Sequence, residues 1–149
     1  MQDSNQFHAV ALDTDPPIFY MNDVSRAIIA LITEYNRVSV ENGGHYKAAY
    51  TYDAGPNAVI YAPKENIKDI VSLIVKYFPQ AEPFKDPFKL FGEAGVGEGS
   101  VVAGFNTAVA KPFTVGAVKG LIHTRVGDGP RVLGEEEALL GANGLPKSA

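Results

Sequence analysis

The chain has 149 residues, of which 46% are hydrophobic and 20% charged, and this balance predicts one domain with a core of its own. The formal net charge of -4 argues against broad nucleic-acid binding, which needs a basic surface. The absence of cysteine excludes disulfide bonds and thiol chemistry. No apolar run approaches the roughly 18 residues of a membrane span, and residues 1–5 lack the order of a signal peptide. We expect a soluble, cytoplasmic domain without nucleic-acid or membrane partners.

The first predicted element is a short helix from Asp3 to about Leu12. The apolar residues Phe7, Val10 and Ala11 are expected to face inward. The helix must end before the two prolines at 16–17, because residues that precede proline avoid the α region. An extended apolar connector is expected to follow.

A longer helix should begin near position 22 and run to about Arg37, with Asn22, Asp23 or Ser25 as its N-terminal cap. Its apolar residues fall at helical spacing and predict one buried stripe of Ile28, Leu31, Ile32 and Tyr35. A third helix is predicted to open with Pro63 and Asn66 and to stop at Pro79. Its apolar face comprises Ile67, Ile70, Val71, Ile74 and Phe78.

Residues 48–61 predict a hairpin, since aromatic and β-branched residues flank a turn at Asp53–Asn57. Gly55 permits a positive φ there, and Pro56 keeps Gly55 out of the α region. The turn places the Asp53 carboxylate at the end of a strand, beside backbone that a ligand can approach closely. An aspartate at such a position can also simply hydrogen-bond its own turn.

Residues Gln80 to Gly104 predict an irregular insertion, with a mobile loop from Gly92 to Ser100. A further strand is expected from Val115 to Val126, with His123 facing outward. Two long helices beside a small sheet, without regular βαβ alternation, indicate an α+β fold. We expect a small, mainly antiparallel sheet with helices packed on one face, and a single domain over residues 1–149.

Other candidate chemistry is sparse. The sequence has no nucleotide-binding glycine loop and no clustered metal-ligand motif. His8 is interpreted as a half-buried, hydrogen-bonded helix residue, with a ligand role as the alternative. Asp13 and Asp15 have a spacing that could chelate magnesium, but a turn before the prolines is the favoured interpretation. No metal site is predicted.

A series of motifs, in order along the chain, resembles the diphosphomevalonate decarboxylase family. These motifs are Ser4–Ala9, Leu12–Thr14, Pro16–Asp23, Tyr50–Val59, Val126–Pro130 and Gly144–Lys147. The resemblance covers nearly the whole chain apart from the insertion. It places the chain in the superfamily of galactokinase, homoserine kinase, mevalonate kinase and phosphomevalonate kinase.

The resemblance implies that ATP phosphorylates the tertiary hydroxyl of mevalonate diphosphate, and that loss of phosphate and carbon dioxide yields isopentenyl diphosphate. Asp53 matches the essential aspartate of the family, which lies near that hydroxyl as a base or orienting acceptor. A carboxylate within hydrogen-bond reach of an alcohol can take or orient its proton. Ala54, Gly55, Asn57 and His8 are the expected substrate-binding residues.

The resemblance covers only the C-terminal half of that family, whose nucleotide loop and diphosphate-binding side chains belong largely to the N-terminal half. We therefore expect no cofactor in the isolated chain, and ATP with Mg²⁺ only if that half is supplied. Three interpretations remain open. The chain is a fragment that is inactive alone, a stand-alone relative that does ATP-independent acid–base chemistry on an isoprenoid-derived or other apolar metabolite, or a non-catalytic binding module.

A surface that the missing half would have covered should be apolar and favour self-association. We therefore predict either a homo-oligomer or a partner equivalent to the N-terminal domain. A monomeric mass by light scattering at high concentration would argue against the oligomer.

Overall fold

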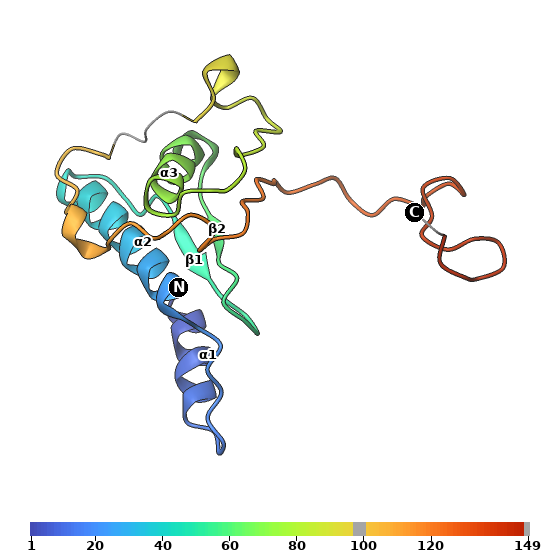
Figure 1. Ribbon diagram of the computed structural model, residues 1–149, viewed down its shortest axis with the longest axis horizontal. Coiled ribbons are helices and arrows are strands. Elements are labelled where there is room, and N and C mark those ends of the chain that lie inside the picture. Colours follow the sequence, from blue (N-terminus) through green and yellow to red (C-terminus); the bar gives the residue numbers. More distant parts are fainter. Residues whose placement is uncertain (97–100, 148–149) are drawn as a thin grey trace.

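The structure, a computed structural model, describes residues 1–96 and 101–147. In chain order the regular elements are α1 (Gln2–Leu12), α2 (Asp23–Glu41), β1 (Ala49–Thr51), β2 (Val59–Tyr61) and α3 (Lys64–Tyr77). Two short 3₁₀ helices follow, η1 (Gly92–Ala94) and η2 (Thr107–Val109). Figure 1 shows the hairpin beside α2 and α3, α1 at one end of α2, and the C-terminal segment reaching away from the rest. The predicted α+β class is confirmed.

The two strands pair antiparallel with the register Ala49↔Tyr61, Tyr50↔Ile60 and Thr51↔Val59. Because successive residues of a strand point to opposite faces, Tyr50 and Ile60 share one face and their neighbours share the other. Tyr50 is 4% exposed and Ile60 packs against the core, whereas Val59 and Tyr61 are 46% and 66% exposed. The helices therefore cover one face of the sheet, as the sequence predicts.

The core forms between α2, α3 and the covered face of the sheet. The predicted stripe of α2 is fully confirmed, since Ile28, Leu31, Ile32 and Tyr35 are all buried. On α3, Ile70, Val71 and Ile74 are buried as predicted, and Phe78, directly after the helix, is completely buried. Full burial of such a side chain stabilises the fold by about 1.5–3 kcal/mol.

Asn22 is the residue that caps α2. Its side-chain oxygen accepts a hydrogen bond from the Ser25 amide at 3.0 Å, and the Ser25 hydroxyl oxygen accepts one from the Asn22 amide at 3.2 Å. This reciprocal capping box satisfies two amides that the first turn of a helix leaves unpaired. The helix continues to Glu41, beyond the predicted end near Arg37. None of the helices in the described ranges is long and apolar enough to cross a membrane.

The buried face of α1 differs from the prediction. Ser4, His8 and Ala11 are buried at helical spacing, whereas Phe7 and Val10 are 49% and 62% exposed. The prediction for Ala11 is confirmed, and those for Phe7 and Val10 are wrong. The physical reason is that α1 packs against polar main chain just after β1, so its buried side includes hydrogen-bonding side chains.

The predicted strand from Val115 to Val126 is wrong, because these residues form no strand. Val118 and Leu121 pack partly against the core, but Ile122 is 93% exposed. An apolar run becomes a strand only where a neighbouring strand pairs its backbone groups, and within the described residues β2 pairs with β1 alone. The outward placement of His123 is also wrong, since its ring packs on Phe88 with centroids 4.6 Å apart.

The insertion after α3 is irregular, as predicted, apart from η1. Of the loop predicted to be mobile over residues 92–100, positions 97–100 lie outside the described residues. Residues Gly104 and Asn106, at the end of the insertion, contact α2.

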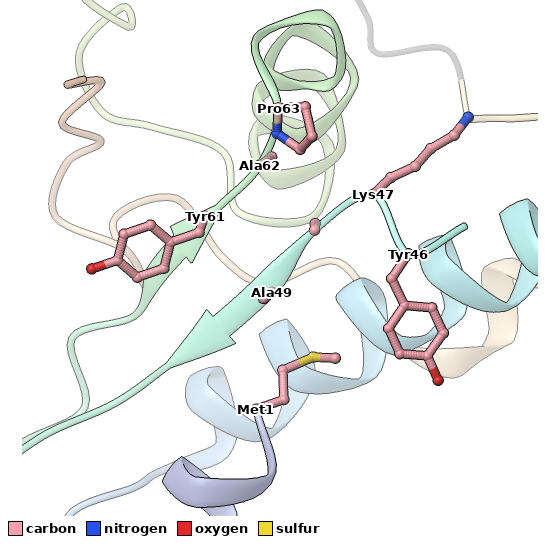
Figure 2. Close-up of a pocket in the computed structure, with 8 residues that line it drawn as sticks. Met1, Tyr46, Lys47, Ala49, Tyr61, Ala62 and Pro63 are labelled. Carbon is pink, nitrogen blue, oxygen red and sulfur yellow. The ribbon is translucent and has the colours of Figure 1, made fainter. Parts of the chain in front are cut away.

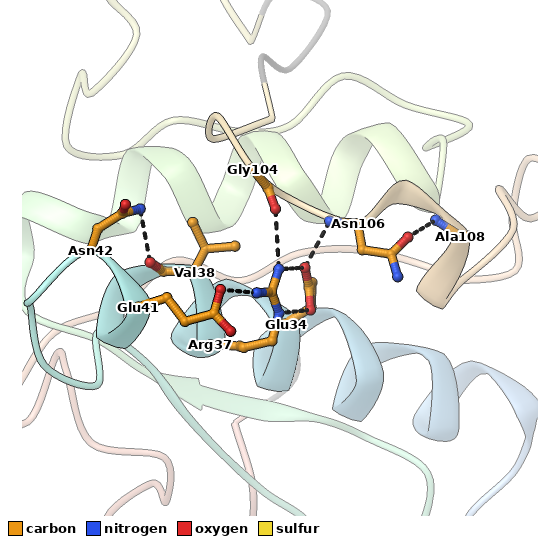
Figure 3. A network of polar contacts seen from close by, with 8 residues as sticks. All are labelled: Glu34, Arg37, Val38, Glu41, Asn42, Gly104, Asn106 and Ala108. Atoms are coloured by element: carbon orange, nitrogen blue, oxygen red, sulfur yellow. Dashed lines mark hydrogen bonds and ion pairs between the residues drawn. The ribbon is translucent and has the colours of Figure 1, made fainter.

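A buried carboxylate makes that contact. Glu34 on α2 accepts hydrogen bonds from Nε of Arg37 at 2.7 Å and from the Asn106 amide at 2.7 Å (Figure 3). Arg37 also donates to the Gly104 carbonyl at 3.1 Å and pairs with Glu41. The Arg37 hydrogen bond lowers the pKa of Glu34 against the opposing effect of burial, and the Asn106 amide lowers it further.

We expect Glu34→Gln to destabilise the chain by about 2 kcal/mol near neutral pH, since charge-assisted hydrogen bonds are lost. Because folding lowers the pKa of Glu34, the contribution of its carboxylate to folding stability is complete above the ordinary carboxyl pKa of 4.5. That contribution disappears as the pH falls through the pKa that Glu34 has in the folded state. The difference between wild type and variant, measured by urea unfolding, should therefore shrink in acid.

Glu41→Gln is the matched control, because Glu41 pairs with the same arginine but its side chain is 63% exposed. Its effect should stay within about 0.5 kcal/mol. Equal losses for the two variants, or a Glu34 effect that grows in acid, would contradict the assignment.

Candidate active site

Asp53 lies on the exposed loop that joins β1 to β2. The Gly55 amide donates a hydrogen bond to the Asp53 main-chain carbonyl at 2.9 Å. Gly55 has a φ of 148°, as the sequence predicts for this turn, and such a value favours glycine strongly. A methyl group added to Gly55 would meet nothing within 4 Å, so the space beside this backbone is open to a ligand.

The start of this loop is attached to α1. The Ser4 hydroxyl oxygen accepts a hydrogen bond from the Tyr52 amide at 3.0 Å, and the hydroxyl lies 3.4 Å from the Tyr52 carbonyl oxygen, to which it donates. One residue along α1, Asn5 accepts a hydrogen bond from the Tyr50 hydroxyl at 3.1 Å. The polar face of α1 therefore holds the residue that directly precedes Asp53.

The loop is also attached to the first turn of α2. The Tyr52 hydroxyl donates to the Ser25 carbonyl at 3.1 Å, and the Ser25 hydroxyl lies 3.5 Å from the Pro56 carbonyl oxygen. Burial, with a smaller contribution from Tyr50, raises the pKa of Tyr52. The Tyr52 hydroxyl therefore stays protonated at neutral pH and remains a donor to α2.

The structure brings together four of the five residues predicted for the site. Asp53, Ala54 and Asn57 are exposed on one short loop, with Gly55 half-buried between them. Their grouping follows directly from the hairpin, and whether they contact substrate remains a prediction.

His8 lies apart from those four residues. It is 4% exposed, and its ring packs edge-on against Tyr52 and Tyr20, with centroids 6.2 and 6.0 Å away. It is more deeply buried than the sequence suggests, and its Nε2 has no hydrogen-bond partner among residues 1–96 and 101–147. Its predicted substrate contact stays a prediction, and it lies on α1 rather than on the loop.

The family model described as "Mevalonate 5-diphosphate decarboxylase C-terminal domain" matches residues 1–133. The chain belongs to this family. The Asp53 loop and the two helices that hold it all lie within the matched part. The resemblance drawn from the motifs is thereby confirmed.

Known decarboxylases are similar over nearly the whole chain. Diphosphomevalonate decarboxylase of Ganoderma lucidum is 82% identical over 147 residues, which is 99% of this chain and 36% of the relative. The Schizosaccharomyces pombe protein of that name is 42% identical, over 99% of this chain and 34% of its own length. A crystal structure of mevalonate 5-diphosphate decarboxylase matches with a TM-score of 0.66 and 36% identity, over 97% of this chain and 36% of that chain. The chain thus spans about a third of the length of these relatives.

The contacts that Ser4 and Ser25 make with the Asp53 loop were not predicted from the sequence. Their partners lie 48 and 31 positions away along the chain. One signal was present, because Ser4, His8 and Ala11 share a helical face and Ala11 was expected to be buried. A serine and a histidine on the same helical face as a buried alanine indicate a face that packs through polar contacts.

Asp13 and Asp15, before the prolines, lie in a turn, which is the interpretation that the sequence favours over a magnesium site. The Thr14 hydroxyl between the two aspartates is 2.8 Å from the Ala11 carbonyl oxygen and 2.9 Å from the Pro16 carbonyl oxygen. In the described part of the chain, no group of three or more acidic, histidine or cysteine side chains could hold a metal ion.

Two hollows lie elsewhere on the domain. One of about 320 Å³ opens on the uncovered side of the hairpin around Ala49 and Tyr61, with Met1 and Tyr46 also lining it (Figure 2). A second, of about 500 Å³, lies between β2, the start of α3 and residues 88–90 and 123–126. Neither is lined by Asp53, which is exposed on its loop.

Proposed function

We propose that this chain forms the C-terminal part of a diphosphomevalonate decarboxylase and supplies Asp53 as its catalytic carboxylate. The observation that carries the proposal is an exposed carboxylate on a short loop held by both α1 and α2. The 82% identity to the Ganoderma lucidum enzyme supports it. The substrate would be mevalonate 5-diphosphate, and the product isopentenyl diphosphate.

The Asp53 carboxylate accepts the proton of the substrate's tertiary hydroxyl as that oxygen gains a phosphoryl group. ATP supplies this phosphoryl group and leaves as ADP. The bond between the substrate carboxylate and the adjacent methylene carbon then breaks. Its electron pair forms the carbon–carbon double bond as phosphate departs from the tertiary carbon, and carbon dioxide is released.

Nucleotide and metal binding are assigned to residues outside this chain. The described side chains include no cluster suited to Mg²⁺, and phosphoryl transfer depends chiefly on positioning and neutralising the phosphates. The isolated chain is expected to be inactive, and Ala54, Gly55 and Asn57 are proposed to border the substrate beside Asp53.

The test is a chimera in which residues 1–147 replace the matching third of the Ganoderma lucidum enzyme. We expect the chimera to release phosphate and carbon dioxide from mevalonate 5-diphosphate in the presence of ATP and Mg²⁺, at a rate within about tenfold of the parent enzyme. The chain alone, assayed at the same concentration, should release neither.

A chimera that folds like the parent by circular dichroism and binds substrate, yet gives no product, would refute the proposal. Product formation by the isolated chain without ATP would instead favour stand-alone acid–base chemistry.

A further inference from the structure

We propose that Ser4 is a positioning residue for Asp53, and that its hydroxyl fixes the peptide plane from which the Asp53 side chain projects. The proposal rests on the function assigned to Asp53 above. It assigns to α1 an indirect part in the chemistry, exerted through the main chain of Tyr52.

The backbone pairing of the hairpin ends one residue before Tyr52. At the end of the hairpin that carries the Asp53 loop, the last paired residues are Thr51 and Val59. The backbone amide and carbonyl of Tyr52 therefore lie beyond the end of β1. Tyr52 is 4% exposed and Ser4 is 7% exposed, which leaves little access for water. Buried backbone groups need a partner, and the Ser4 side chain takes the place of a neighbouring strand.

A hydroxyl is suited to this position because it both donates and accepts. Ser4 accepts from the Tyr52 amide at 3.0 Å and faces the Tyr52 carbonyl oxygen at 3.4 Å. That carbonyl belongs to the same planar peptide unit as the Asp53 amide. Holding its oxygen therefore fixes the plane from which the Asp53 Cα and side chain project.

A second support acts on the same loop from α2. The Tyr52 hydroxyl donates to the Ser25 carbonyl at 3.1 Å, and the Ser25 hydroxyl is 3.5 Å from the Pro56 carbonyl oxygen. With Tyr52 held on both sides, the remaining freedom of Asp53 is rotation about its own bonds. Loss of the Ser4 contacts releases the peptide plane, and small misplacements of a reacting group reduce rate steeply.

The experiment uses the chimera with the Ganoderma lucidum enzyme and compares Ser4→Ala with Ser39→Ala. Ser39 is the matched control because it is also 7% exposed and its hydroxyl donates to a backbone carbonyl, that of His45, at 2.7 Å. It lies at the opposite end of α2 from the Asp53 loop. We expect Ser4→Ala to lower kcat at least tenfold with KM changed less than threefold, and Ser39→Ala to leave kcat unchanged.

Ser4→Thr keeps the hydroxyl and should restore most of kcat. Ser4→Cys fills similar space with a weakly hydrogen-bonding group and should behave like alanine, so it serves as the second variant if Ser4→Ala does not fold. Combined with Asp53→Asn, Ser4→Ala should produce no further loss of kcat, because the carboxylate that it positions is already gone.

Three results would overturn the inference alone: unchanged kcat in folded Ser4→Ala, an equal loss in Ser39→Ala, or an undiminished Ser4→Ala effect in the Asp53→Asn background. Unchanged kcat in Asp53→Asn by itself would overturn the proposed function and this inference together. The two failures are therefore distinguishable.

Discussion

Asp53→Asn should lower kcat of the chimera by about 10²–10⁴-fold, the contribution usual for a general base. Asparagine keeps the size of the side chain, but its amide cannot take the proton of the tertiary hydroxyl. Because Asp53 is exposed on its loop, the substitution should leave the folding stability within about 0.5 kcal/mol of wild type. The measurement is phosphate release at saturating ATP and substrate, with thermal unfolding in parallel.

Asp128→Asn is the matched control. Asp128 is also exposed but lies in the C-terminal segment far along the chain from the hairpin, so its substitution should leave kcat unchanged. A folded Asp53→Asn enzyme that retains wild-type kcat would remove the catalytic assignment.

Phe78→Ala should be the most destabilising of the single changes considered, at about 3–5 kcal/mol. Phe78 is completely buried after α3, and its ring lies 5.0 Å from that of Phe113. The neighbouring Tyr77 carbonyl accepts a hydrogen bond from the Phe113 amide at 2.8 Å. The cavity would thus open between α3 and the returning chain, and urea unfolding of the purified chain would measure the loss.

Phe19→Ala makes the same chemical change on the surface, since Phe19 is 76% exposed. Its effect on stability should stay within about 0.5 kcal/mol. Similar losses for the two phenylalanine variants would mean that the core does not sit where the structure places it.

The elements that were predicted correctly are those whose pattern is local. The stripe of α2 from Ile28 to Tyr35 and the face of α3 follow from helical spacing, and the hairpin turn follows from Gly55 and Pro56. Asp53 could be singled out because turn residues at a strand end are visible in sequence. Its surroundings could not, because Ser4 contacts the adjoining residue Tyr52 across 48 positions of chain.

The wrong predictions have the same origin. Phe7 was expected to face inward because apolar residues usually do, but the buried face of α1 carries Ser4 and His8, which meet the main chain and the ring of Tyr52. The run from Val115 to Val126 has the composition of a strand, yet strand formation depends on a partner edge that composition does not specify.

The contact of Glu34 with Asn106 has a practical consequence for engineering. Together with the packing of Phe78 it anchors both ends of the irregular insertion to the helices. The entropy of closing such a loop grows slowly, by about 0.6 kcal/mol for each doubling of length. Around residues 81–83, which are exposed and outside regular structure, the chain should therefore accept a fluorescent reporter or an affinity tag while the Asp53 loop remains undisturbed.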